Sequence, residues 1–310
     1  MKTFLQGAVM GIAELIPGIS GSTLALTMGI YDEFVLLLHQ IATVPKILLL
    51  IILRKEQWKS LKTLLKEINF RFAILLIAGT GVSILLFANV LSYLLHNHPQ
   101  YIYAAFCGII IASLIIPYRA LDKPSWKEIT IVIFSFLVMF LAFGLTPPKN
   151  ENPSYTIMFI GGIFGITGLF LPGVSGSFIL LIMGIYTYVI ETVKSIATLS
   201  IKTSDLSNFL VFILGLASGF IISAKLLRYL LKHQYRNLMA FVAGLLIASI
   251  RVLWPFLRIE GEETIKVLPH QVDLQLLFAI TLIALLAGTI TLAVARNSHN
   301  DNASLSEASR

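Results

Sequence analysis

The sequence predicts an all-α integral membrane protein of two inverted-topology repeats, each with a re-entrant broken-helix hairpin followed by about three transmembrane helices. Three observations predict this fold class. Of the 310 residues, 57% are hydrophobic and only 13% are charged, which is too little charge to cover the surface of a soluble domain of this length. Apolar stretches of about 20 residues, long enough to cross a bilayer, recur from end to end. An unusual proline-glycine-serine motif also occurs twice.

The motif opens each half of the chain. ELIPGISGSTLALTMGIYDEF at Glu14–Phe34 is followed much later by LFLPGVSGSFILLIMGIYTYV at Leu169–Val189. The two stretches align without a gap, with Pro17 and Pro172 lying 155 residues apart. Identical residues in the same frame, separated by a whole half-chain, predict an internal duplication.

A second set of matches follows at a different spacing. Gly79 pairs with Gly215 and Gly108 with Gly244, 136 residues apart, and the tripeptide IAS ends at Ser113 and again at Ser249. A longer basic loop in the first half absorbs the difference in spacing. We therefore predict a first membrane repeat at 1–150, a second at 151–295 and a disordered polar tail at 296–310.

The apolar stretches define six full crossings after the motif segments. The expected helices are Phe72–Leu95, Tyr101–Pro117 and Ile129–Leu145 in the first repeat, and Phe209–Leu231, Leu238–Trp254 and Leu274–Val294 in the second.

Loop charge predicts the orientation of these helices. Cytoplasmic loops of membrane proteins are enriched in Lys and Arg. Basic residues gather at 54–71, 119–127 and 225–236, whereas the loops at 96–100, 146–155, 191–208 and 259–273 are neutral or acidic. With the basic loops in the cytoplasm, equivalent helices run in opposite directions and both termini are cytoplasmic. Inverted repeats of this kind are typical of transporters.

The same orientation constrains the two motif segments. Each begins and ends on one side of the membrane, so each turns back, and the turn residues are Pro17-Gly18 and Pro172-Gly173. We expect two re-entrant hairpins whose tips meet near the midplane. Two full crossings per motif segment remain an alternative.

A helix that breaks at membrane depth leaves backbone N–H groups without partners, and it is tolerated where it lines a cavity or meets a ligand. Glycines allow close approach of the backbone, and serine hydroxyls add donors, so the turns have the form of an anion site. The alternative interpretation is serine N-caps with glycines used for helix packing. The candidate ligand-binding residues are Pro17, Gly18, Ser20, Gly21, Ser22, Pro172, Gly173, Ser175, Gly176 and Ser177.

The doubled pattern, E-x-x-P-G-x-S-G-S and L-P-G-V-S-G-S, each followed by M-G-I-Y, resembles the bacterial polyprenyl-phosphate translocases (PopT-like), formerly a domain of unknown function. The resemblance covers nearly the whole chain. It implies a flippase that returns undecaprenyl phosphate across the bacterial cytoplasmic membrane for reuse in cell-wall synthesis. Polyprenyl-phosphate lipid is then the expected partner, the turns hold its phosphate, and neither nucleic acid nor a cofactor is expected.

Charged residues inside membrane segments are costly and usually functional. Glu14 lies one turn before the first break, and we expect it to carry a proton, bind a cation or pair with a base. Arg251 is the first candidate for a basic partner of the phosphate, because a guanidinium grips two oxygens, and Lys225 is the second. Snorkelling to the interface explains either residue without a function. The single cysteine, Cys107, is expected to pack in an apolar segment.

Two other functions fit parts of the sequence. Membrane-embedded undecaprenyl-diphosphate phosphatases share inverted repeats and a P-G-x-S turn, but Gly21 and Gly176 stand where that family has an arginine. The groups needed for hydrolysis are too sparse here, and the six histidines show no metal-ligand spacing. A carrier of small soluble anions is separated from the first hypothesis only by the resemblance.

Overall fold

The structure is a computed structural model, and it describes residues 1–16, 20–53, 58–145, 149–198, 200, 202–260 and 263–308. Two of the candidate binding residues, Pro17 and Gly18, lie outside the described residues.

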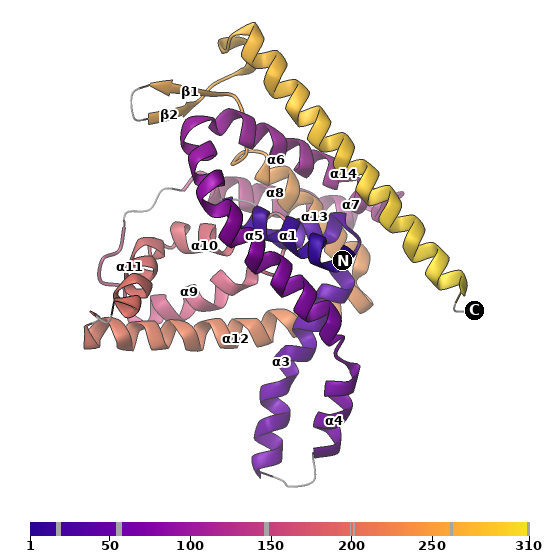
Figure 1. Ribbon diagram of the computed structural model, residues 1–310, viewed down its shortest axis with the longest axis vertical. Helices are drawn as coiled ribbons and strands as arrows, with labels where there is room; N and C mark the ends of the chain where they lie inside the picture. The colour runs from indigo at the N-terminus through magenta and orange to yellow at the C-terminus, as the bar shows by residue number, and fades with distance from the viewer. Residues whose placement is uncertain are drawn as a thin grey trace.

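The chain is almost wholly helical (Figure 1), with two short antiparallel strands near the start of the last helix. The helices are α1 Lys2–Glu14, α2 Gly21–Thr27, α3 Tyr31–Leu53, α4 Trp58–Glu67, α5 Phe70–Asn97, α6 Pro99–Ser113, α7 Ile115–Leu121, α8 Trp126–Ala142, α9 Tyr155–Thr167, α10 Gly176–Ile182, α11 Tyr186–Ala197, α12 Thr203–His233, α13 Tyr235–Ser249 and α14 Leu274–Ala308; the strands are β1 Leu257–Glu260 and β2 Glu263–Lys266.

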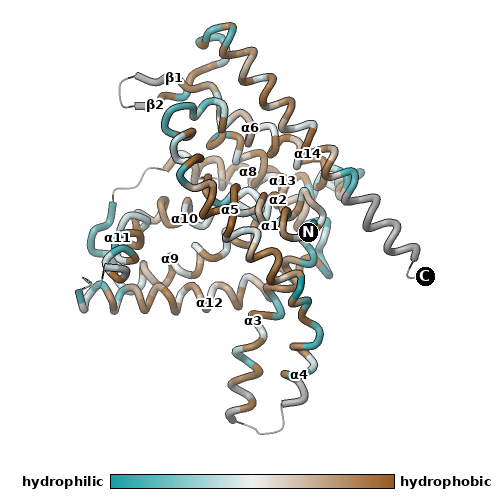
Figure 2. Tube along the Cα trace, viewed as in Figure 1, coloured by the Kyte–Doolittle hydropathy of each residue, from teal (hydrophilic) through white to brown (hydrophobic). Residues whose placement is uncertain are grey.

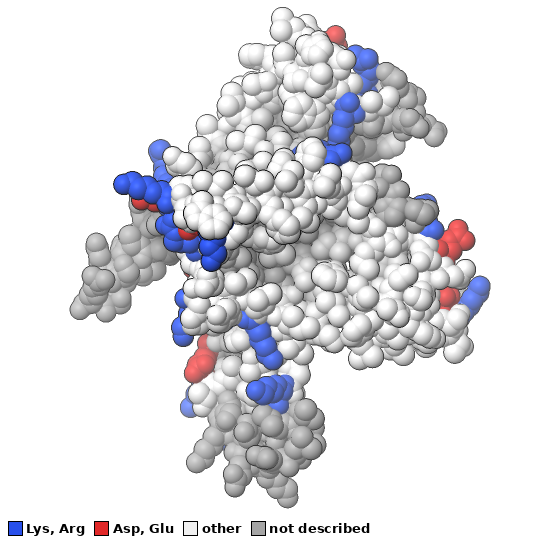
Figure 3. All heavy atoms as spheres, turned by 180° about the vertical axis from the view of Figure 1, so that it is seen from behind, with Lys and Arg blue, Asp and Glu red and all other residues white. Residues whose placement is uncertain are grey.

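Long apolar helices make this a multi-pass membrane protein. Among the described residues, four helical stretches have the length and hydropathy to cross a bilayer, and a bent pair raises the number to five. Figure 2 shows hydrophobic residues along most of each long helix, and Figure 3 shows Lys and Arg mainly toward the edges of an otherwise uncharged face. The four stretches are Phe70–Asn97, Pro99–Leu121, Thr203–His233 and Leu274–Asn297.

Helices lie at all six predicted crossings, as α5, α6, α8, α12, α13 and α14. Four of them, α5, α6 (with α7), α12 and α14, are in stretches long and apolar enough to span, whereas full crossings by α8 and α13 stay a prediction. The last helix, α14, begins at Leu274 and ends at Ala308. The disordered tail expected at 296–310 stays a prediction.

The motif segments form short helices on either side of a break. α1 and α9 each have 13 residues, or about 20 Å of helix axis, and α2 and α10 each have seven, or about 10 Å. None of them alone covers the hydrocarbon core of about 30 Å. After α10 the chain bends by 115° into α11, so the segment does not continue along one line.

The MGIY half of each motif makes the same turn in both repeats. Gly29 has φ +69° and Gly184 has φ +73°, in the left-handed region that favours glycine. The residue after each glycine donates its N–H to the carbonyl five residues back, Ile30 to Ala25 and Ile185 to Leu180. This is the Schellman helix ending. The repeated sequence therefore folds into the same local structure twice, before Tyr31 and before Tyr186.

Helix packing also follows the duplication. α1 packs on α5 as α9 packs on α12, while α14 packs on α6 as α8 packs on α13. Matched glycines form these contacts: a Cβ at Gly79 would lie 2.0 Å from the Phe4 carbonyl, and one at Gly215 would lie 2.2 Å from the Phe159 carbonyl. Because α6–α14 and α8–α13 each join one half to the other, segments 1–150 and 151–295 are interwoven.

One ion pair ties α8 to α13. Arg236 donates from Nε to Glu128 Oε1 at 2.6 Å, and a second guanidinium nitrogen donates to the carbonyl of Leu121 at 2.8 Å. Glu128 also accepts from the Ser125 N–H in the first turn of α8. The hydrogen bonds from Arg236 and Ser125 lower the pKa of Glu128 to about 2, so this link is charged throughout the neutral range.

Candidate functional site

The two motif turns lie against each other. Ser20 Oγ, before α2, donates to the carbonyl of Gly168 at the end of α9, at 2.8 Å. In the other direction, the N–H of Gly173 donates to Thr23 Oγ1 at 2.9 Å. The hydroxyl of Tyr31 donates to the Phe170 carbonyl at 2.8 Å. These three hydrogen bonds join residues about 140 to 150 positions apart.

This contact is closed in the described structure. Ser20 is 1% exposed, Ser22 and Thr23 are fully buried, and Ser175 is 4% exposed. The aromatic ring of Phe170 is also 1% exposed and belongs to the main core. A phosphate that reaches the buried Ser20 and Ser22 therefore needs the two turns to separate.

Gly173 is constrained by its backbone conformation, by two hydrogen bonds and by close packing. Its φ is +85°, a conformation that residues with a side chain rarely adopt. Its carbonyl accepts from Ser249 Oγ at 2.7 Å, while its N–H is held by Thr23. A Cβ at this position would lie 3.1 Å from both the Leu245 carbonyl carbon and Ser249 Oγ. Glycine is required here both by conformation and by the close approach of α13.

The side chain of Glu14, the last residue of α1, binds the start of α2. Its Oε1 accepts a hydrogen bond from the N–H of Gly21 at 2.7 Å. The sequence predicts that this N–H group binds the phosphate, but in the structure it binds the carboxylate of Glu14. Ser20 Oγ also accepts from the Ser22 N–H and lies 2.9 Å from Ser22 Oγ. Free N–H groups and the helix dipole favour a negative charge at this end of a helix. The N–H groups of Gly21 and Ser22 therefore have hydrogen-bond acceptors from within the chain.

The second turn lacks that internal anion. Leu169, just beyond the end of α9, stands at the position of Glu14 in the repeat, so the second turn has no carboxylate from the corresponding residue. Ser175 Oγ and Ser177 Oγ are 2.7 Å apart, as Ser20 and Ser22 are in the first turn. Ser177 is exposed whereas Ser22 is buried. The two turns share a geometry but differ in charge and access.

The two basic candidates lie away from the turns. Arg251 donates to the Phe140 carbonyl of α8 at 2.6 Å, with its guanidinium 4.3 Å from the centre of the Phe140 ring. Lys225 is exposed on α12. Among the described residues, the structure brings neither one into a hydrogen bond or ion pair with a turn.

Sequence reasoning missed several residues that position the turns. Thr23 and Tyr31 bridge the halves, and Ser249 holds Gly173. Ser113 lies 2.8 Å from Thr27 Oγ1 of α2. The two serines carried a signal, because both end the repeated IAS tripeptide, and each contacts the broken helix of its own half. Thr23 and Tyr31 carried no such signal in the sequence, because their hydrogen bonds to the other half depend on tertiary contact.

Among the described residues, no group of three or more His, Cys, Asp or Glu side chains is placed to hold a metal ion. Cys107 is buried, as its apolar segment predicts.

Comparison with known proteins gives a consistent result. Residues 10–267 match a family model described as undecaprenyl phosphate translocase-like. The chain is 32% identical to a protein of Vibrio cholerae serotype O1 named polyprenyl-phosphate transporter, over 83% of this chain and 78% of the relative. It is 27% identical to a protein of the same name from Staphylococcus aureus, over 81% of this chain and 85% of the relative. No solved structure shows significant similarity.

Proposed function

Because this chain belongs to the undecaprenyl phosphate translocase-like family, we propose that it moves undecaprenyl phosphate between the leaflets of the bacterial cytoplasmic membrane for reuse in cell-wall synthesis. The relatives named polyprenyl-phosphate transporter support this lipid class. The observation that carries the proposal is the pair of motif turns, which are hydrogen-bonded to each other through Ser20, Gly168, Thr23 and Gly173.

In the proposed mechanism, the head group enters between the two turns while the prenyl chain stays in the lipid. Separation of the turns exposes the backbone N–H groups and hydroxyls of both SGS segments to the phosphate, and closure returns them to the hydrogen bonds of the described structure. These donors replace the water that the head group loses, because charge-assisted hydrogen bonds to an anion are strong. By their place in the motif, Pro172, Pro17 and Gly18 are proposed to take part in the same phosphate site; Pro17 and Gly18 lie outside the described residues.

We propose that the two basic residues act at different stages of the movement. Lys225 lies in the final third of α12 and Arg251 just beyond the end of α13. In the predicted orientation, Lys225 is near the cytoplasmic leaflet and Arg251 near the outer one. Each meets the phosphate on its own side, which accounts for their distance from the closed turns.

The proposed orientation has re-entrant motif hairpins, inverted repeats and both termini in the cytoplasm. In a Cys107→Ala background, we expect single cysteines at Asn97 and Asn152 to react with an impermeant thiol reagent added to whole cells. A cysteine at Lys62 should react only after the membrane is permeabilised. All three positions are exposed in the structure, so a difference reports sidedness. Labelling of Lys62→Cys in intact cells, with none at Asn97→Cys, contradicts the orientation.

The chain is a transporter rather than an enzyme, in keeping with its family and relatives. Purified protein in liposomes should equalise undecaprenyl phosphate between the leaflets, measured by the fraction of a head-group-labelled lipid that an impermeant quencher reaches. The same vesicles should release no inorganic phosphate from undecaprenyl diphosphate, with or without divalent metal. Phosphate release by the protein contradicts the proposal. Uptake of inorganic phosphate without lipid movement assigns the site to small anions instead.

A further inference from the structure

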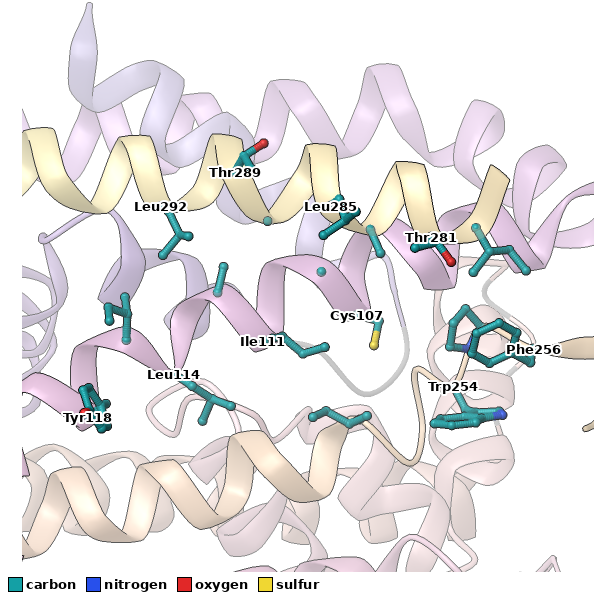
Figure 4. A pocket seen from close by; sticks show the side chains of 18 residues that line it. Cys107, Ile111, Leu114, Tyr118, Trp254, Phe256, Thr281, Leu285, Thr289 and Leu292 are labelled. Carbon is teal, nitrogen blue, oxygen red and sulfur yellow. The ribbon is translucent and has the colours of Figure 1, made fainter. Parts of the chain in front are cut away.

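A long apolar groove runs between α6 and α14 (Figure 4). Cys107, Ile111 and Leu114 line one wall, and Leu285 and Leu292 line the other. The cavity has a volume of about 700 Å³, within the range of pockets that bind a small molecule or cofactor. Its lining residues on α14 extend from Ile280 to Leu292, about 18 Å of helix axis. The groove is therefore long and almost without polar groups.

A second cavity adjoins one end of this groove. It has a volume of about 490 Å³ and lies between α8, the end of α13 and β2. Its charged lining residues are Arg251 and Lys266, which are set among aromatic and aliphatic side chains such as Phe136 and Phe140. Ile250 and Trp254 line both cavities, so the cationic cavity begins where the apolar groove ends.

The two cations in the second cavity have no anionic partner among the described residues that line it. Lys266 Nζ donates to the carbonyls of Arg251 and Val252 at 2.5 and 3.2 Å, and Arg251 donates to the Phe140 carbonyl. Partial burial, and then the neighbouring charge of Arg251, hold the pKa of Lys266 below its ordinary value. Two like charges held together beside apolar surface favour the binding of an anion between them.

We propose that the two cavities form one binding site for a polyisoprenyl phosphate, with the phosphate on Arg251 and Lys266 and the first isoprene units in the α6–α14 groove. The inference rests on the proposed function for its lipid class, and it adds a site that is separate from the motif turns. Charge complementarity selects a phosphate at one end, and the apolar groove selects a hydrocarbon chain at the other. The chain crosses the rim formed by Ile250 and Trp254.

The test uses the full-length protein in detergent and titrates it with farnesyl phosphate, a short polyisoprenyl phosphate, by calorimetry. We expect wild-type protein to bind farnesyl phosphate more tightly than either farnesol or inorganic phosphate. The Arg251→Gln and Lys266→Gln variants should each weaken binding roughly tenfold or more, because each removes a charge-assisted hydrogen bond. Arg71→Gln, a change of the same kind at an exposed position of α5 outside both cavities, should leave binding unchanged.

The groove has its own matched pair of variants. Leu285 lines the groove and is 61% exposed, while the next residue on α14, Leu286, is 54% exposed and lies outside it. Leu285→Trp should weaken binding of farnesyl phosphate but not of inorganic phosphate, and Leu286→Trp should change neither. If a tryptophan variant does not assemble, a cysteine at position 285 in a Cys107→Ala background should be protected from a thiol reagent by farnesyl phosphate, and one at 286 should not.

Three results overturn the inference. The first is that the Arg251→Gln and Lys266→Gln variants bind farnesyl phosphate as tightly as wild type, and the second is that substitutions at positions 285 and 286 change its binding equally. The third is that phosphatidylglycerol competes for the site as well as farnesyl phosphate does. These results are distinguishable from failure of the proposed function. Normal movement of undecaprenyl phosphate in liposomes with any of these binding results removes only this site. The expected binding results without any lipid movement retain the site and remove the transport function.

Discussion

Transport of undecaprenyl phosphate is expected to fall below detection in Gly173→Leu. The side chain meets two obstacles at once: a φ of +85° that costs a residue with a Cβ about 1–3 kcal/mol, and a Cβ position 3.1 Å from Ser249 Oγ and from the Leu245 carbonyl carbon. A backbone shift that relieves either the positive φ or the close contact moves the Gly173 N–H away from Thr23. The hydrogen bond between the two halves is then lost. The measurement is leaflet exchange of the labelled lipid in liposomes.

The chain offers a matched control for this change. A Cβ added to Gly81 of α5 would have no neighbouring atom within 4 Å, so Gly81→Leu adds the same side chain in open space and should transport normally. Gly173→Ala, the milder variant, should slow transport roughly tenfold, as expected when about 1.4 kcal/mol is added to the barrier. Both Gly173 variants should elute as assembled protein. Normal transport by assembled Gly173→Leu contradicts a role for the turn contact.

Sequence reasoning located the helices well because their signals are local. Apolar length alone defines α5, α12 and α14, and the doubled MGIY sequence folds into the same Schellman ending at Gly29 and Gly184. The break in each motif segment follows from proline and glycine, whose backbone preferences act within a few residues. These features need no knowledge of what packs against them.

The partners of the turns depended on contacts that a sequence does not contain. The serines and glycines of the motif were recognised, but nothing local indicates that the Gly173 N–H meets Thr23, or that Glu14 accepts from Gly21. The chemistry of the guanidinium predicts Arg251 as a partner of the phosphate. Its place against Phe140 follows from the packing of α13 on α8, between residues more than 100 positions apart.

The asymmetry between the turns gives Glu14 a specific role in the proposed cycle. The carboxylate on the Gly21 N–H and a lipid phosphate compete for the same end of α2, because both are anions that this helix end favours. Because a protonated Glu14 is a weaker partner for an N–H donor, we expect proton uptake to open the first turn to the phosphate. The second turn has Leu169 at this position and needs no such step.

Glu14→Gln is therefore expected to remove the pH dependence of transport. Glutamine keeps an oxygen that accepts from Gly21 but never carries a charge, so lipid exchange in liposomes should run at the same rate at every pH tested. Wild-type exchange, by contrast, is expected to slow as pH rises and Glu14 ionises. Glu14→Asp keeps the ionisable group on a shorter side chain that reaches Gly21 less well, and it should retain a pH dependence with a faster rate at high pH. Glu33→Gln, which changes an acid that accepts from Asn69 outside the turns, should behave as wild type. An unchanged pH profile in Glu14→Gln places the titrating group elsewhere and leaves Glu14 as a helix cap only.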